Sequence, residues 1–173
     1  MVRFVTTVFV ELFRGTSLLV QMFFFFFALP AFGITLTPFA AGVIALGLNY
    51  GAYASEIVRG AIVAVPQGQI EAGIALNMTR WQRMRLIILP QAVRMMLPGF
   101  GNISIELLKG TSLVSLVTLA DMTFQANMLK DSNTGAVIEI YTLLLILYFL
   151  IALPLILTAR WLEKRSGKGV TAR

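Results

Sequence analysis

The sequence contains no cysteine and no histidine in 173 residues. The absence of both excludes disulfides, thiol chemistry, the usual zinc sites and histidine acid–base catalysis. Charged residues are also scarce: they make up 13% of the chain, where a soluble domain carries roughly a quarter. No motif places a nucleophile beside a base. We therefore expect a protein that is not an enzyme, with no catalytic residue, no metal site and no cofactor.

Apolar residues dominate instead. They make up 58% of the chain, and its mean hydropathy of +0.84 points to the bilayer as solvent. Four stretches are long enough to be membrane spans: residues 16–32, 38–57, 93–119 and 136–159. Lipid requires the backbone to satisfy its own hydrogen bonds, and these runs do not alternate as barrel strands do. The sequence predicts an all-α, polytopic membrane protein that forms a single transmembrane domain over residues 1–173.

Basic residues orient the four predicted spans. Of fourteen lysines and arginines, two precede the first span, five lie between the second span and the first residues of the third (Arg94 included), and five follow the fourth. Cytoplasmic loops carry such an excess. We therefore expect both termini and the central loop, residues 60–92, to be cytoplasmic. This distribution explains the net charge of +6 without a nucleic-acid partner.

The central loop is a polar island bracketed by Pro66 and Pro90. A proline permits a helix to begin and disfavours its continuation, so we expect a short helix over residues 69–78. Gly73 and Asn77 would lie on one side of it, where their small size admits another backbone. The same side would carry an apolar stripe: Ile70, Ile74 and Trp81. An amphipathic helix that rests on lipid headgroups is an equally weighted alternative.

The loop resembles the Glu-Ala-Ala loop of bacterial importer permeases of the ATP-binding-cassette (ABC) class. That pattern is Glu-Ala-Ala, three residues, Gly, nine residues, Ile, one residue, Leu-Pro, and the spacing here agrees throughout. Gly73 replaces the second alanine and Asn77 the glycine; asparagine tolerates left-handed backbone better than most residues. The resemblance implies that the loop couples the permease to an ATPase. The implied coupling residues are Glu71, Ala72, Gly73, Asn77, Leu89 and Pro90.

Segments elsewhere resemble one branch, the polar amino-acid permeases. They are residues 10–16, 51–62, 89–92 and 109–113. The resemblance implies a type I importer permease fold in the bacterial inner membrane. It also implies a second permease subunit (a homodimer or a heterodimer), an extracytoplasmic solute-binding protein and two cytoplasmic ATPase subunits. No GxxxxGK[ST] loop is present, so the energy must come from a separate polypeptide.

Such permeases usually have five spans, and this chain offers four. The helix expected first has no counterpart, which indicates a fragment, a misassigned start or a dispensable span. Two other classes stay open. An ion-coupled carrier would need more spans and internal repeats, and a membrane scaffold would not transport.

Polar side chains within the spans are candidates for a translocation path, because a charge at mid-bilayer costs about 2.5–3.5 kcal/mol and usually faces a bundle interior or water. They are Gln21, Asn102, Glu106, Lys109, Thr111 and Ser112. Mutual neutralisation of Glu106 and Lys109, aided by helix breaks near residues 98–99 and 110, is an equally weighted reading. In the resembling family this helix helps to line the route.

Gly110 stands where many members of that family have an acid, which favours a zwitterionic amino acid or a compatible solute such as ectoine over a cationic one. Glu56 and Arg59, three residues apart, are predicted to form an interfacial ion pair. A gate or loop anchor is the alternative role for this pair.

Overall fold

The computed structural model describes the backbone of residues 2–167 and the side chains of residues 3–164, and every regular element within these ranges is helical. Three long helices form the frame: α3 (Pro38–Val63), α6 (Leu89–Gly110) and α8 (Val137–Gly167). The shorter ones are α1 (Val2–Gly15), α2 (Leu18–Phe23), α4 (Gln67–Ala75), α5 (Arg80–Arg83) and α7 (Met122–Ser132). Two π turns (Phe24–Ala28 and Met84–Ile88) and three 3-10 segments (Leu29–Phe32, Thr111–Val117 and Thr134–Ala136) extend them. The all-α prediction is confirmed.

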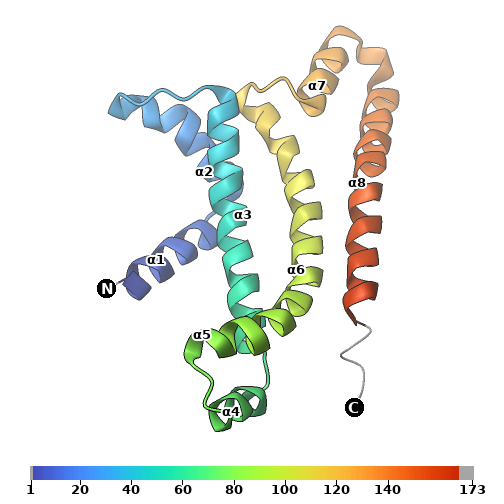
Figure 1. Ribbon diagram of the computed structural model, residues 1–173. Helices are drawn as coiled ribbons and strands as arrows, with labels where there is room; N and C mark the ends of the chain where they lie inside the picture. The colour runs from blue at the N-terminus through green and yellow to red at the C-terminus, as the bar shows by residue number, and fades with distance from the viewer. Residues whose placement is uncertain (1, 168–173) are drawn as a thin grey trace.

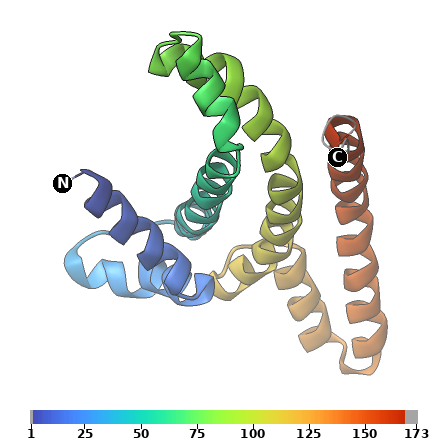
Figure 2. The ribbon, with the colours of Figure 1, turned by 90° about the horizontal axis from the view of Figure 1, so that it is seen from below.

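The helices stand side by side in an open row (Figures 1 and 2). α1 and α2 pack on α3, α3 packs on α6, and α6 packs on α8. Residues 64–88, which contain α4, α5 and the second π turn, fold back at one end of the row; we call this segment the elbow. α7 lies at the opposite end, and α8 ends on the side of the elbow (Figure 1).

Within the described residues, two helical stretches are long and apolar enough to cross a membrane: Arg80–Val117 and Thr134–Lys164. A third span results if Arg3–Gly15 and Leu18–Phe32, which meet at 102°, count as one broken span. The prediction of four spans therefore exceeds the two or three found by length and composition. The difference is α3, which is long enough but contains polar and glycine residues. Because α3 packs against neighbours on two sides, it presents less surface to lipid than α8 does.

Hydropathy does not predict α1 or α7, because charged residues interrupt both segments. α1 is amphipathic: Phe4, Val8 and Leu12, spaced by four, are exposed on one side. α7 occupies most of the predicted connection over residues 121–135. It begins where Asp121 Oδ1 accepts a hydrogen bond from the Phe124 amide at 2.8 Å, which is the usual signature of an N-cap.

Both π turns precede a Leu-Pro pair. The amide of Leu29 bonds to the oxygen of Phe24, and the amide of Leu89 bonds to that of Met84, each five residues back. Proline lacks an N–H, and its ring crowds the carbonyl four residues earlier, so the turn before it widens. By contrast, α6 runs unbroken through residues 98–99, and at residue 111 it tightens into a 3-10 segment. The predicted helix break at residues 98–99 is therefore wrong.

Buried side chains form two clusters, one at each end of α3. The elbow-end cluster joins α3 to α6 and consists of Ala61, Val65, Ile88, Ala92 and Met96. Ile70 of α4 and Met84 of the second π turn pack against it, so the elbow is fastened to the long helices. The second cluster joins α2 and α3 to the 3-10 segment after α6; its members are Met22, Ala45, Val114 and Val117.

The contact between α6 and α8 depends on a glycine. A Cβ atom on Gly101 would lie 2.9 Å from the Cβ atom of Ala159. We expect Gly101→Val to destabilise the protein by about 1–3 kcal/mol, the usual cost of overpacking. The measurement is the midpoint of thermal unfolding in detergent, followed by circular dichroism. Gly47→Val is the matched control, since nothing lies within 4 Å of a Cβ atom there; equal midpoints for the two variants would contradict the prediction.

Candidate functional site

The elbow turns sharply at Asn77, whose φ of 53° is left-handed. The Asn77 amide donates to the oxygen of Ile74 at 2.9 Å, and the Met78 amide donates to that of Gly73 at 3.0 Å. This pair of bonds is the Schellman closure, which usually places glycine at the left-handed position. The tolerance of asparagine for that geometry explains how Asn77 replaces the motif glycine.

The elbow helix is shorter than predicted, because α4 ends at Ala75. Trp81 consequently lies on α5, which begins at a capping box formed by Thr79 and Gln82. The predicted single apolar face is therefore wrong. Trp81 is 70% exposed on α5, while Ile74 is 53% exposed on α4.

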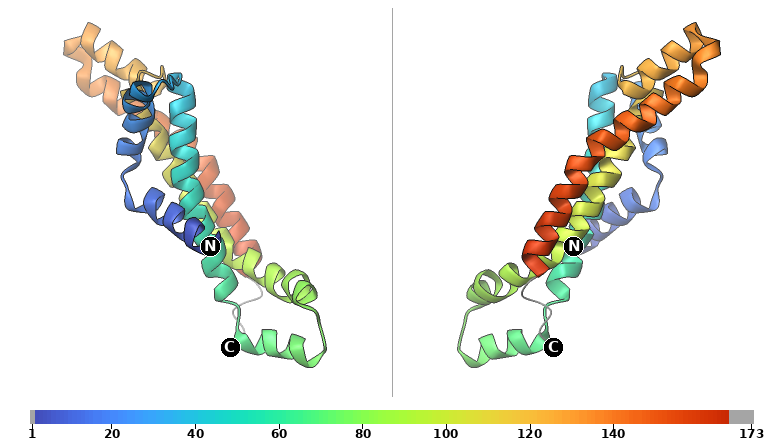
Figure 3. Two further views of the ribbon diagram at one scale, coloured as in Figure 1. Left: turned by 90° about the vertical axis from the view of Figure 1, so that its left-hand side faces the viewer. Right: turned by 90° about the vertical axis from the view of Figure 1, so that its right-hand side faces the viewer.

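The exposed part of α4 and the turn after it carry three of the six predicted coupling residues. Glu71, Ala72 and Asn77 are exposed, and Leu76 beside them is 75% exposed. Gly73 is buried, and a Cβ atom on it would meet the side chains of Arg83 and Ile87 in the same elbow. The two remaining predicted residues, Leu89 and Pro90, lie at the start of α6. The elbow therefore offers a convex tip that projects from the end of the helical row (Figure 3).

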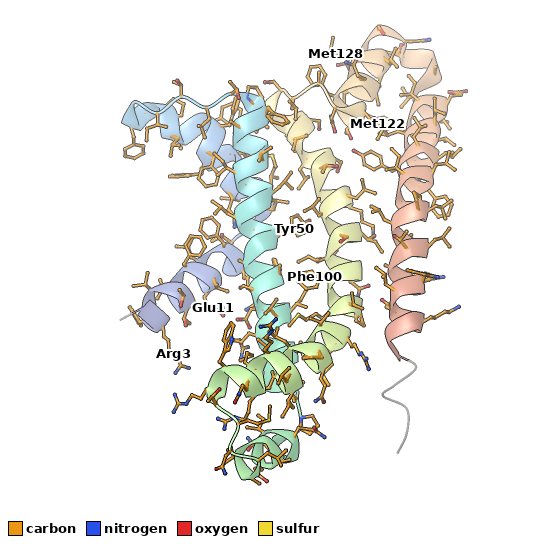
Figure 4. The ribbon with its side chains drawn as sticks, in the orientation of Figure 1. Arg3, Glu11, Tyr50, Phe100, Met122 and Met128 are labelled. Atoms are coloured by element: carbon orange, nitrogen blue, oxygen red, sulfur yellow. The ribbon has the colours of Figure 1, made fainter. Side chains whose placement is uncertain are left out.

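A groove between α3 and α6 brings several predicted residues together. It has a volume of about 380 Å³. Asn102 and Glu106, predicted on the path, line it opposite Glu56, predicted as a gate or anchor. The other lining residues are Arg14, Tyr53, Ile57, Gly99 and Ile103. Figure 4 shows Tyr50 and Phe100 in the space between the same two helices.

Glu56 holds an ion-pair network at the edge of this groove. Nη2 of Arg59 lies 2.6 Å from Oε2 of Glu56, so the predicted pair is confirmed. Nη1 of Arg14 lies 3.8 Å from the same oxygen and 3.2 Å from Oε1 of Glu11. The Tyr53 hydroxyl donates to the main-chain oxygen of Arg14 at 3.2 Å. The network joins the end of α1 to α3.

Arg14 is a groove residue that sequence reasoning missed. Its guanidinium carbon lies 5.5 Å from the centre of the Tyr53 ring, within the usual range of a cation–π contact. The sequence alone shows only an arginine before an apolar run. The contact could not be predicted, because Arg14 and Tyr53 are 39 residues apart in the sequence.

Residues 1–168 match the family described as binding-protein-dependent transport system inner membrane component. This chain belongs to that family. It is the permease subunit of an ABC importer, a multi-pass component of the inner membrane that works with a binding protein and an ATPase on a separate subunit. The expected family, fold and separate ATPase are thereby confirmed.

Several named relatives resemble the permease over most of its length. A probable amino-acid ABC transporter permease protein of Sinorhizobium fredii is 50% identical over 90% of this chain and 67% of its own. The L-cystine transport system permease protein of Bacillus subtilis is 42% identical over 97% of this chain and 72% of its own. The glutamine transport system permease protein of Escherichia coli K12 is also 42% identical, over 93% of this chain and 74% of its own.

Two solved structures resemble the permease. One, an amino acid ABC transporter with histidines, is 39% identical with a TM-score of 0.86, covering 92% of this chain and 74% of that one. The other, an inward-facing methionine ABC transporter, has a TM-score of 0.67 and covers 90% and 73%. At 21% identity this second likeness supports the fold alone.

The polar residues of α6 do not pair as predicted. Among the ion pairs of the described residues, none joins Glu106 to Lys109, and both are exposed. The main-chain oxygen of Glu106 accepts a hydrogen bond from Tyr50 Oη at 2.8 Å. Thr111 and Ser112, in the 3-10 segment after α6, donate to main-chain oxygens of the last turn of α6, at 2.7 Å each. Glu106 lines the groove and Lys109 does not. The hypothesis that these two residues neutralise each other's charge within α6 is therefore wrong.

Gln21 is enclosed at the junction of α1, α2 and α3. It is 7% exposed, and its amide donates to the oxygen of Phe13 at 2.8 Å and to Thr16 Oγ1 at 2.7 Å. Asn49, 5% exposed, donates to the oxygen of Phe13 at 2.9 Å and to Oε1 of Gln21 at 3.3 Å. These bonds satisfy the carbonyls at the end of α1, as helix ends require. Gln21 thus has a structural role, and its place on the path stays a prediction.

Among the described residues, no three His, Cys, Asp or Glu side chains gather closely enough to hold an ion.

Proposed function

We propose that the permease carries a zwitterionic polar amino acid, or a related compatible solute, through the groove between α3 and α6. The observation that carries this proposal is the charge pattern of the groove, whose lining contains the arginine Arg14 together with the acids Glu56 and Glu106. A carboxylate is best recognised by a guanidinium, and an ammonium by a carboxylate. The relatives named for glutamine and L-cystine support this class of solute.

Coupling takes place at the elbow. The proposed docking surface is the exposed part of α4 together with Leu76 directly after it, so that the apolar Ile74 and Leu76 flank Glu71 and Ala72. Exposed apolar residues suit a groove on a partner. ATP-driven movement of the ATPase then biases the permease toward one of two access states, because the two states contact the partner differently.

The complete transporter is proposed to contain two permease subunits and two ATPase subunits. A second permease, identical or similar, faces the open row of helices. The elbow and both termini are cytoplasmic in this proposal. Two observations support this orientation: the basic residues of the sequence collect in these regions, and α8 ends on the same side as the elbow (Figure 1).

Single cysteines test the docking surface directly, because the chain has none of its own. The permease is purified with its binding protein and ATPase, and a photo-crosslinker is attached to Glu71→Cys. We expect a covalent product with the ATPase. Lys130→Cys, on α7 at the opposite end, is the control and is expected to give none. Products with lipid alone at position 71, or equal ATPase products at both positions, would refute the docking.

The solute is tested by uptake into proteoliposomes that contain ATP. Radiolabelled glutamine, cystine and ectoine are compared with arginine. Accumulation of a zwitterion that requires ATP and ignores proton and sodium gradients is expected. Preferential uptake of arginine would contradict the proposed class, and uptake driven by an ion gradient would favour a carrier.

A further inference from the structure

Arg83 ties the two arms of the elbow together across Gly73. Its Nη1 atom donates a hydrogen bond to the main-chain oxygen of Met78 at 3.1 Å. Its aliphatic stem fills the place of the missing side chain: a Cβ atom on Gly73 would lie 2.9 Å from Cδ and 3.0 Å from Cγ of Arg83. The same Cβ atom would lie 3.0 Å from Cδ1 of Ile87. Glycine at position 73, where the resembled motif has alanine, is therefore what admits this stem.

Met78 is held from both sides of the turn. Its amide donates to the oxygen of Gly73 on α4, and its oxygen accepts from Arg83 on α5. The angle between α4 and α5 cannot open without loss of one of these bonds. Because the guanidinium is charged and the contact is partly buried, its hydrogen bond is stronger than one between neutral groups.

The far end of α5 continues into the long helices. α5 passes through the π turn Met84–Ile88 into α6, and Ile88 is buried in the elbow-end cluster against α3. A displacement applied to α4 reaches α6 by this route only if the turn at residues 76–79 does not bend. Stiffness at that turn is what Arg83 supplies.

We propose that Arg83 is a positioning residue for coupling, which fixes α4 relative to α6 so that a force on α4 moves the membrane helices. This inference rests on the proposed docking of α4 on the ATPase. It assigns no contact with ATPase or solute to Arg83. Loss of the guanidinium is therefore expected to lower the amount of solute moved per ATP hydrolysed while ATPase binding is retained.

The test compares Arg83→Met with Arg80→Met in the complete transporter in proteoliposomes. Methionine keeps the stem and removes the donor; Arg80 lies exposed on the same helix. We expect Arg83→Met to lower the ratio of solute transported to ATP hydrolysed about tenfold, the effect of one charge-assisted hydrogen bond. The solute KM and the ATPase content of the purified complex stay unchanged. Arg83→Lys, which keeps a donor, restores much of the ratio.

Three results would overturn the proposal. Equal ratios in Arg83→Met and Arg80→Met would show that the bond to Met78 does not matter. Loss of ATPase from the Arg83→Met complex alone would place Arg83 on the docking surface itself. Absence of ATPase from the wild-type complex would remove the docking role and this proposal together, which separates that failure from a failure of Arg83.

A double-mutant cycle tests the packing separately. Gly73→Ala is expected to lower the transport ratio in the wild-type background, because the new Cβ atom displaces the stem of Arg83. In an Arg83→Ala background, the same change is expected to have a much smaller effect, because only the contact with Ile87 remains and the effects of residues in contact are not additive. Equal effects in both backgrounds would contradict the contact.

Discussion

Replacement of Asn77 by valine is expected to reduce ATP-driven uptake at least tenfold, whereas replacement by glycine leaves it near the wild-type rate. The φ of 53° at this position costs an ordinary L-residue about 1–2 kcal/mol, and a β-branched side chain is a genuine outlier there. Valine therefore opens the Schellman closure and releases the Met78 amide from Gly73. The tip of α4 then loses its fixed position relative to α5.

The measurement is uptake of the radiolabelled solute together with the amount of ATPase that purifies with the permease. Asn77→Gly is the control, because glycine adopts the left-handed region without steric cost. The permease itself should still insert, since residue 77 lies outside both helical stretches that are apolar enough to span. Wild-type uptake by Asn77→Val would show that the turn is not needed for coupling.

Neutralising Glu106 is expected to have the second large effect. In Glu106→Gln the groove keeps its shape but loses the acid proposed to face the ammonium group of the solute. A hydrogen bond to a charged group contributes about 1.5–3 kcal/mol, which corresponds to a loss of roughly ten- to a hundredfold. The KM for the solute should therefore rise at least tenfold, and uptake at solute concentrations below KM should fall by the same factor, while the ATPase content of the complex is unchanged.

Glu139→Gln is the matched control, because Glu139 is exposed in the first turn of α8 and does not line the groove. Uptake by this variant should equal that of the wild type. The prediction fails if Glu106→Gln transports as fast as Glu139→Gln. A fall in both variants would indicate a general effect of charge on the permease rather than a role for the groove.

Helix class and elbow position could be predicted because their signals are local. The apolar run of α8 needs no partner to be recognised, and the Leu-Pro pairs change the helix geometry through the chemistry of proline alone. Asn77 was predictable in the same way, since its left-handed geometry follows from its own side chain and a fixed spacing in the motif.

Other features depend on neighbours and could not be predicted. α1 has an exposed apolar stripe and a charged side, so it passes no hydropathy test by itself, yet it supplies Arg14 to the groove. The spacing of Glu106 and Lys109 allows a pair, but the register of α6 against α3 directs only Glu106 to the groove. The spacing cannot reveal this choice, because both arrangements satisfy the same helix.

The amino-acid sequence by itself determined that this is a helical membrane permease with a polar elbow between its long helices, because apolarity, proline and the motif act within short segments. Only the tertiary structure decided which partners the charged side chains have. Arg14 of α1 lies near Glu56 of α3, and Arg83 donates a hydrogen bond to the main-chain oxygen of Met78 while its stem covers Gly73. Such contacts depend on where the helices cross and on the size of the side chains between them, and neither is encoded at any one position.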